Sequence, residues 1–308
     1  LNNVDIISSN FYDLRLPDNQ YDVIFFVGVL EYAGRFAPDG RSAEESVRHL
    51  LKKAIPSLTS EGVIIIAIEN RLGRKYLCGA AEDHYGIAFE GIHGYPNYTG
   101  IKTWSREEWT TLLKQAGLEY TFHYPFPDYK LPTLVLNDDY VSTNPHVWTH
   151  LTGISHRDYH QLIEPTDDIR FWEGADYSGH LGSFSNSFLI AASPNKYSLT
   201  DITPYDFVHF SNLSRQPAFR TQTRMRNQTN LVEKLCLYND ADKPVSLMKH
   251  NALTESWRGG LPLSNIWIRS LAANPHHSMV KHLSGEYFRY LESRFANDVD
   301  TQNLIDVL

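Results

Sequence analysis

The clearest candidates for acid–base chemistry lie in the sequence "AAEDHYG", where Glu82, Asp83 and His84 are consecutive. A carboxylate beside a histidine can orient the imidazole or raise its basicity, and such a histidine can take a proton from a reacting hydroxyl group. We therefore predict His84 as a general base and Asp83 as its partner, with His93 as a further histidine of the same segment. The alternative is a structural role, in which Asp83 and His84 hold the loop through hydrogen bonds to its backbone.

Polar residues also follow two apolar runs, "YDVIFFVGVLEY" (21–32) and "VIIIAIEN" (63–70), at the point where each run ends. The residues at these ends are Gly28, Glu31, Tyr32, Glu69 and Asn70. Open parallel sheets bind ligands beyond the carboxyl ends of their strands, so we expect these residues to face a ligand. Glu31 has an alternative role, since it could cap the next helix or pair with Arg35.

The segment 71–103 is long, irregular and rich in Gly, Tyr and His, which is typical of a functional lid. Its tyrosines could stack on a sugar or form a small core of the loop itself, and its cations could bind a phosphate or simply be solvated. These residues are Tyr76, Tyr85, Tyr95, Tyr98, Arg71, Arg74 and Lys75.

Metal binding is disfavoured by the sequence. His156 and His160 have the i, i+4 spacing that can place two ligands on one face of a helix. Their neighbours do not supply the third ligand of a familiar site, so we predict no metal site.

The elements that must position these residues alternate between strands and helices. Apolar or β-branched runs predict strands at 4–11, 21–30, 63–70, 119–136 and 183–194, and helical spacing predicts helices within 37–58 and at 105–118. Both helices begin with the spacing of a capping box, which is found in Ser42 with Glu45 and in Ser105 with Glu108. Helices between apolar strands indicate an α/β fold with a parallel sheet and helices on both faces. The prolines of 119–136 suit an edge or antiparallel strand, and 183–194 would close the sheet.

The composition fits a folded globular protein of 308 residues with 42% hydrophobic and 21% charged residues. The net charge of -8 argues against nonspecific binding to nucleic acid, and no apolar run is long enough to span a membrane. Two cysteines, Cys78 and Cys236, are too few for a disulfide framework, so we expect a cytoplasmic protein. The sequence changes character after Pro194, and we place a domain boundary near 195–204.

Four segments of the chain resemble a known family. "NFYDLRLPDNQYDVIFFVGVLEY" and "SEGVIIIAIENRLG" resemble the second half of a class I S-adenosylmethionine (SAM)-dependent methyltransferase. "ENRLGRKYLCGAAEDHYG" and "YPFPDYKLP" resemble methyltransferases attached to bacterial polysaccharide and glycosyltransferase proteins. The resemblance covers residues 1–194 and implies a partial Rossmann-like sheet. We expect 195–308 to be an appended α+β module, either a complete accessory module or the start of a domain that continues further.

The resemblance also implies SAM as the cofactor. It places Asn10 and Phe11 near the adenine, and the end of the family's fourth strand along the cofactor. That strand end consists of Gly28, Val29, Leu30 and Glu31. The residues expected to face the acceptor are Tyr32, Glu69 and Asn70, with Arg71, Tyr76 and His93 from the loop.

The resemblance is incomplete, because the family's glycine-rich loop and ribose-binding acidic residue do not occur in this sequence. We therefore expect part of a longer protein, with unpaired strand edges and weak SAM binding in this region alone. We expect the intact protein to methylate a sugar hydroxyl or terminal phosphate of a cell-surface glycan or its precursor, with glycosyltransferase domains among its partners. The alternative is a noncatalytic module that binds a glycan or a partner enzyme of polysaccharide biosynthesis.

Overall fold

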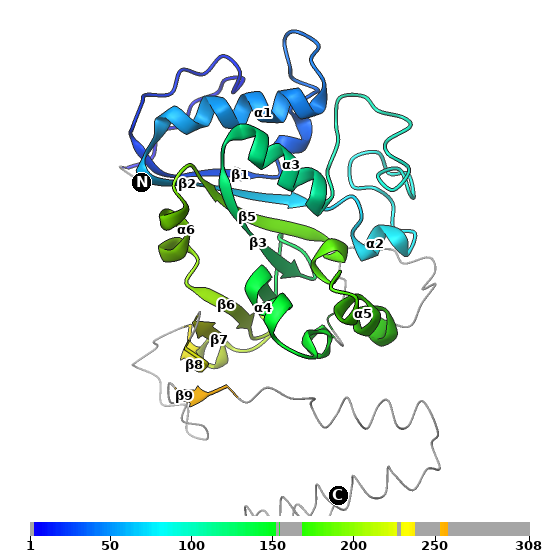
Figure 1. The fold of residues 1–308 in the computed structure, drawn as a ribbon, viewed down its shortest axis with the longest axis vertical. Helices are drawn as coiled ribbons and strands as arrows, with labels where there is room; N and C mark the ends of the chain where they lie inside the picture. Colours follow the sequence, from blue (N-terminus) through cyan, green and yellow to red (C-terminus); the bar gives the residue numbers. More distant parts are fainter. Residues whose placement is uncertain (1–2, 152–153, 155–167, 227–228, 238–252, 258–308) are drawn as a thin grey trace, which may run out of the picture. The chain divides into compact units, whose positions relative to one another are not determined.

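One mixed β-sheet runs through the part of the protein that the computed structural model describes (Figure 1). The described residues are 3–151, 154, 168–226, 229–237 and 253–257, and all of them belong to one unit, Leu1–Arg258. The His156–His160 pair and the C-terminal segment from 258 onward lie outside the described residues.

Nine strands form the sheet within these residues, in the order β1-β2-β5-β3-β4-β6-β7-β8-β9. Their bounds are β1 Tyr21–Val27, β2 Leu58–Glu69, β3 Glu119–Phe126, β4 Leu134–Asn137, β5 Ser187–Ser193, β6 Tyr205–Phe210, β7 Thr221–Arg226, β8 Leu231–Cys236 and β9 Leu253–Ser256. β1 and β2 are parallel, whereas β5 runs antiparallel to both of its neighbours, β2 and β3. β1, β2 and β3 therefore share one direction, and their carboxyl ends lie at the same edge of the sheet.

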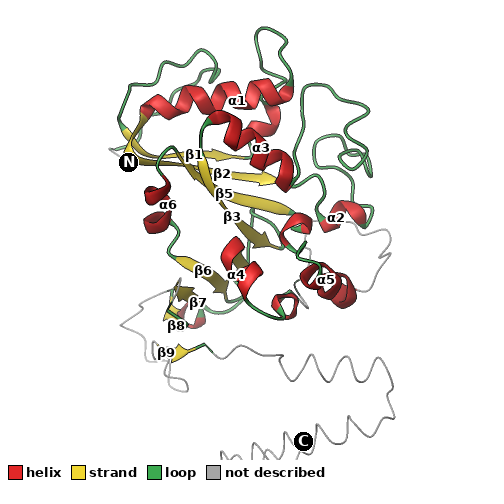
Figure 2. Cartoon of the chain, in the orientation of Figure 1, coloured by secondary structure: helices red, strands yellow, loops and turns green. Residues whose placement is uncertain are grey.

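The helices connect and cover these strands (Figure 2). Their bounds are α1 Ala43–Ala54, α2 Arg74–Leu77, α3 Arg106–Ala116, α4 Asp138–Thr143, α5 Asp168–Tyr177 and α6 Lys196–Ile202. Short 3₁₀ turns occur at η1 Leu30–Tyr32, η2 Ile55–Ser57, η3 Val147–His150, η4 Gly182–Phe184 and η5 Pro217–Phe219. Both predicted capping boxes are present, at Ser42 with Glu45 in α1 and at Ser105 with Glu108 in α3. No helix among these described elements is long and apolar enough to cross a membrane.

Helices cover both faces of the parallel part of the sheet, so the predicted Rossmann-like α/β fold is confirmed. Successive side chains of a strand point to opposite faces. On one face of β2, Val63 is fully buried and packs with Leu199 of α6. On the other face Ile64 and Ile66 are also fully buried. Figure 1 shows α1 and α3 on the side of the sheet away from α6.

Three expectations about the strands are corrected by the structure. Residues 4–11 form no strand, although they are rich in β-branched residues, because a strand needs a partner for its backbone groups. The strand predicted at 183–194 forms β5, but it is inserted between β2 and β3 and does not close the sheet. β1 is less buried than its apolar sequence suggests, since it is an edge strand in the described residues and Phe25 is 65% exposed.

The sheet also continues beyond the predicted methyltransferase region. β6 pairs with β4, and the strands that follow extend the sheet in sequence order. The domain boundary near 195–204 coincides with α6, which connects β5 to β6. That boundary stays a prediction.

Candidate functional site

The chain turns sharply where β1 ends, and the turn exposes polar groups at the edge of the sheet. Gly28 has φ +58°, a conformation that residues with a Cβ atom rarely adopt. A Cβ at this position would lie 3.0 Å from the hydroxyl of Tyr129, so the glycine also permits a close approach. Leu30, which is 1% exposed, anchors η1 in the core, and Glu31 and Tyr32 follow it.

A pocket of about 390 Å³ opens beside this turn. The residues of its wall include Asn10, Phe11, Val29, Tyr32, Ala33 and Phe36. The Asn10 side-chain amide donates a hydrogen bond to the Phe36 carbonyl at 3.3 Å, which fixes the segment before β1 against the segment after it. The structure thus brings together three of the predicted cofactor-binding residues, Asn10, Phe11 and Val29, in a mainly apolar pocket.

A cluster of ionisable side chains lies on the other side of Tyr32. Glu31, Glu69 and His84 each offer one oxygen or nitrogen atom, and these atoms lie within 4.8 Å of one another. The ring of Tyr32 meets the ring of His84 edge to face at 5.3 Å between centroids. Since Tyr32 also lines the pocket, its ring forms a wall shared by the pocket and the cluster.

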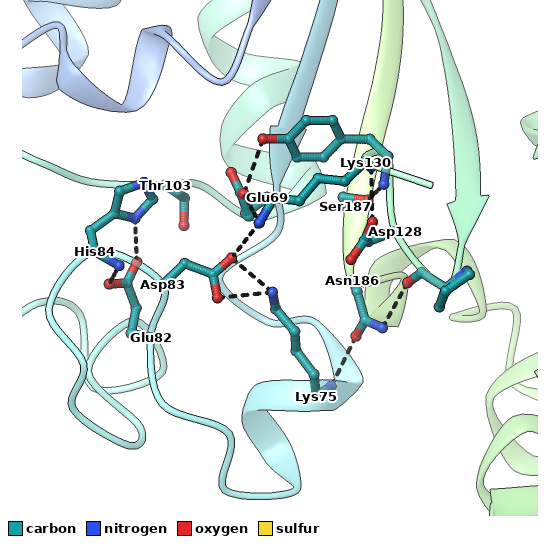
Figure 3. Close-up of polar contacts among 12 residues, drawn as sticks. Glu69, Lys75, Glu82, Asp83, His84, Thr103, Asp128, Lys130, Asn186 and Ser187 are labelled. Carbon is teal, nitrogen blue, oxygen red and sulfur yellow. Dashed lines mark hydrogen bonds and ion pairs between the residues drawn. The ribbon is translucent and has the colours of Figure 1, made fainter. Parts of the chain in front are cut away.

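His84 is held between two carboxylates. Its Nδ1 atom lies 2.9 Å from Glu82 Oε1 (Figure 3). Its Nε2 atom lies 3.8 Å from Glu31 Oε1. Burial alone would lower the pKa of His84, but Glu31 and Glu82 outweigh it and raise the pKa to about 10. An imidazolium has no free lone pair, so these surroundings disfavour the general-base role, which stays a prediction.

Glu82 organises the loop that carries His84. Its carboxylate accepts hydrogen bonds from the backbone N–H groups of His84, at 2.7 Å, and Tyr85, at 2.9 Å. Burial would raise the pKa of Glu82, but its bonds to His84 outweigh burial and lower it. Glu82 therefore holds the loop through hydrogen bonds to its backbone, a role that the sequence suggested for Asp83 and His84.

Glu69, at the end of β2, is 4% exposed and close to other charges. Its Oε1 atom accepts a hydrogen bond from the Tyr129 hydroxyl at 3.1 Å and lies 3.5 Å from the Lys130 ammonium. Burial raises the pKa of Glu69, and the neighbouring Glu31 carboxylate raises it further. The Oε2 atoms of Glu31 and Glu69 are buried and have no hydrogen-bond partner among the described residues.

Asp83 lies beside this cluster but is bound to cations. Its two carboxylate oxygens lie 3.1 and 3.0 Å from the ammonium of Lys75, and Lys130 contacts it at 3.4 Å (Figure 3). Burial opposes ionisation, yet Lys75 and Lys130 lower the pKa of Asp83. Asp83 is therefore a partner of these lysines and makes no recorded contact with His84 in the described structure.

Several predicted substrate-binding residues instead connect structural elements. The Asn70 amide donates to the backbone carbonyls of Ser183 and Ser185, at 2.8 and 2.7 Å. The Arg71 guanidinium binds Glu108 of α3, with 2.7 Å between Nε and Oε2.

The remaining two predicted substrate-binding residues of the loop, Tyr76 and His93, differ in burial. Tyr76 is 2% exposed, and the Lys75 ammonium lies 4.7 Å from the centre of its ring. His93 is exposed, and its ring lies beside Phe89.

Two site residues were missed by the sequence reasoning. Tyr129 and Lys130 reach Glu69 from the loop after β3, about 60 residues along the chain. Their position depends on β5 being inserted between β2 and β3, which the sequence did not predict. The one available signal was the motif "YPFPDYKLP", which contains both residues but to which no role was assigned.

This arrangement combines an apolar pocket with a polar, negatively charged site. An aromatic or aliphatic ligand group can enter the pocket, and carboxylates at the shared Tyr32 wall can attract a positive charge or accept a hydrogen bond.

Comparison with known proteins shows likeness at the level of structure. No family model and no curated protein sequence matches the chain. One similar solved structure is a SAM-dependent methyltransferase from Thermotoga maritima, for which histamine N-methylation is suggested (TM-score 0.33, 15% identity, 62% of this chain and 65% of that chain). Another is a complex of the Haloferax volcanii Trm112 methyltransferase activator with a protein assigned as a methyltransferase (TM-score 0.30, 16% identity, 61% of this chain and 60% of that chain). The chain thus spans less than two thirds of the length of either protein.

Proposed function

We propose that this protein acts in SAM-dependent methyl transfer to a sugar hydroxyl or a terminal phosphate of a glycan-type acceptor. The observation that carries the proposal is the pocket lined by Asn10, Phe11 and Val29, which meets the Glu31–Glu69–His84 cluster at Tyr32. Both features lie at the carboxyl ends of parallel strands, where open α/β sheets bind their ligands.

The pocket suits the adenosine end of SAM. Its volume of about 390 Å³ lies within the range of small-molecule sites, about 300–1,000 Å³. Phe11 and Tyr32 offer aromatic surfaces for a planar base, and Asn10 offers a polar group at the rim.

The cluster suits the reacting end of SAM. The cofactor would supply an activated methyl group on a positively charged sulfonium. Glu31 and Glu69 place negative charge beside the pocket, and the Tyr32 ring can bind a cation through its face. The same carboxylates can hold an acceptor hydroxyl in line with the methyl group, and such positioning is the main requirement of methyl transfer.

The acceptor class rests on the sequence resemblance and on the loop 71–103. We propose a sugar hydroxyl or a terminal phosphate of a cell-surface glycan or its precursor, bound between this loop and the strand ends. Partner glycosyltransferase domains and a cytoplasmic location belong to the same proposal.

Calorimetric titration with S-adenosylhomocysteine, up to millimolar concentration, tests the proposal. Val29 is 49% exposed and lines the pocket, whereas Val27 is 53% exposed and does not. We expect saturable binding that Val29→Trp weakens at least about tenfold (1.4 kcal/mol) and that the matched control Val27→Trp leaves unchanged. A folded chain that does not bind, or equal effects of the two variants, would contradict the proposal and favour a noncatalytic binding module.

A further inference from the structure

The cluster at the strand ends contains more buried negative charge than its neighbours satisfy. Glu31, Glu69 and Glu82 are 2%, 4% and 1% exposed, respectively. A buried carboxylate is costly unless it is paired and hydrogen-bonded. Glu82 meets this condition through the loop backbone and His84.

Glu31 and Glu69 each have one oxygen that is not satisfied. Lys130 and Tyr129 both contact Oε1 of Glu69, and His84 Nε2 lies 3.8 Å from Oε1 of Glu31. Among the described residues no donor reaches Oε2 of either glutamate, and both atoms are buried. These two unpartnered oxygens, on side chains more than nine-tenths buried, point to a ligand that is positively charged.

His84 completes the donor set. Its Nδ1 atom lies 2.9 Å from Glu82 Oε1, so Nδ1 can donate to this carboxylate while Nε2 is turned toward Glu31. Metal-bound histidines commonly bind a carboxylate through their other ring nitrogen, which fixes the orientation of the ring. Nε2 lies 3.8 Å from Glu31 Oε1, and a metal ion in the cluster would replace the proton that the imidazolium carries on Nε2.

We propose that Glu31, Glu69 and His84 together bind one divalent metal ion of the first transition row, with Glu82 orienting the histidine. The three donor atoms lie within 4.8 Å of one another. Two ligands at bond lengths of about 2.0–2.2 Å can be at most about 4.4 Å apart, so side-chain shifts of a few tenths of an ångström close the set. Two carboxylates with one imidazole suit ions such as Mn²⁺ and Zn²⁺.

The backbone at Gly28 lies close to the proposed ligand Glu31. A Cβ at this position would lie 3.6 Å from Glu31 Oε1 and 3.0 Å from the Tyr129 hydroxyl, so a side chain here would crowd both groups. Three protein ligands leave coordination positions open. If the proposed methyl transfer is correct, an acceptor hydroxyl would occupy one of these positions, where the metal lowers its pKa.

Titration of the EDTA-stripped, dialysed chain with MnCl₂, with free Mn²⁺ read by electron paramagnetic resonance, tests the site. We expect about one ion per chain and at least a tenfold loss of affinity in Glu31→Gln and His84→Gln. Glu82→Gln should weaken binding about tenfold or more, as is typical of residues that orient a metal ligand. Circular dichroism checks that each variant is folded.

Two controls separate this site from other places that could bind the ion. Glu90 lies on the same loop, is 2% exposed and accepts hydrogen bonds from the backbone and side chain of Asn97, so Glu90→Gln should bind Mn²⁺ as the wild type does. The double variant His156→Gln/His160→Gln should also keep the site, because its histidines are not among the ligands.

The proposal is overturned if the folded wild-type chain shows no saturable binding, or if Glu31→Gln and His84→Gln bind normally. Loss of binding in the His156/His160 double variant alone would overturn it as well. Because this titration contains no cofactor, its outcome is independent of the S-adenosylhomocysteine titration, which is run in EDTA. A failure of the metal site and a failure of the methyltransferase proposal are therefore distinguishable.

Discussion

At the scale of single residues, Gly28 determines whether the site can form. Its left-handed conformation turns the chain out of β1, and its lack of a side chain admits the Tyr129 hydroxyl that binds Glu69. A glycine followed by a carboxylate at the end of an apolar run was visible in the sequence. The sequence did not reveal that Tyr129 would lie beside this glycine, because that contact depends on how distant strands are ordered in the sheet.

We expect Gly28→Ala to destabilise the protein more than Gly40→Ala. Gly40 has φ +66°, and a Cβ added there would meet no atom within 4 Å, so both substitutions carry the backbone cost of about 1–2 kcal/mol. Gly28→Ala must also displace Tyr129, for a further cost of about 0.5–1.5 kcal/mol. Urea unfolding of the two variants measures the difference, and equal free energies of unfolding would show that the Tyr129 contact is unimportant.

His123 makes stability depend on pH at a residue far from the proposed chemistry. Burial in β3 lowers its pKa from the ordinary 6.5 to about 4. The unfolded chain therefore binds more protons between these pH values, so stability is full above about 6.5 and is lost as the pH falls toward 4. His150, whose pKa burial also lowers to about 4, contributes in the same window.

We expect His123→Leu to reduce the slope of unfolding free energy against pH between about 4 and 6.5. The contribution of one such histidine is on the order of 3 kcal/mol across the window. Chemical denaturation at several pH values gives the slope. A variant slope equal to that of the wild type would mean that folding does not lower the pKa of His123.

At the scale of elements, features set by residues close in sequence could be predicted, whereas the pairing of strands far apart in sequence could not. The capping boxes of α1 and α3 involve residues three positions apart, so the sequence contains all the information that defines them. The place of β5 in the sheet depends on hydrogen bonds to residues more than 60 positions away, and the apolar run alone could not specify it.

The start of α3 also holds the loop that carries His84. The Glu108 carboxylate accepts a hydrogen bond from the Ser105 backbone N–H and binds the Arg71 guanidinium of this loop. Glu45 forms the equivalent capping box in α1 but makes no side-chain contact with the loop among the described residues. We expect Glu108→Gln to increase amide hydrogen exchange in residues 71–103 severalfold, while Glu45→Gln leaves that exchange unchanged. Equal exchange in both variants would show that the Arg71 contact does not restrain the loop.

At the scale of the whole molecule, the sheet places three separate regions of sequence at one edge. The ends of β1 and β2 carry Glu31 and Glu69, and the loop after β3 adds Tyr129 and Lys130. The α/β class could be predicted, and so could the sheet edge at which Glu31 and Glu69 lie, because alternating apolar strands and helices specify both. The contribution of Tyr129 and Lys130 could not be predicted, since it requires the strand order.

Hydrogen exchange of the whole chain with and without saturating S-adenosylhomocysteine tests the central claim most directly. We expect protection in 9–12 and 28–36, which contain residues of the pocket wall, and unchanged exchange in β6, β7 and β8. Protection confined to other segments, or none at a ligand concentration that saturates binding, would contradict the claim that the end of β1 forms the cofactor site.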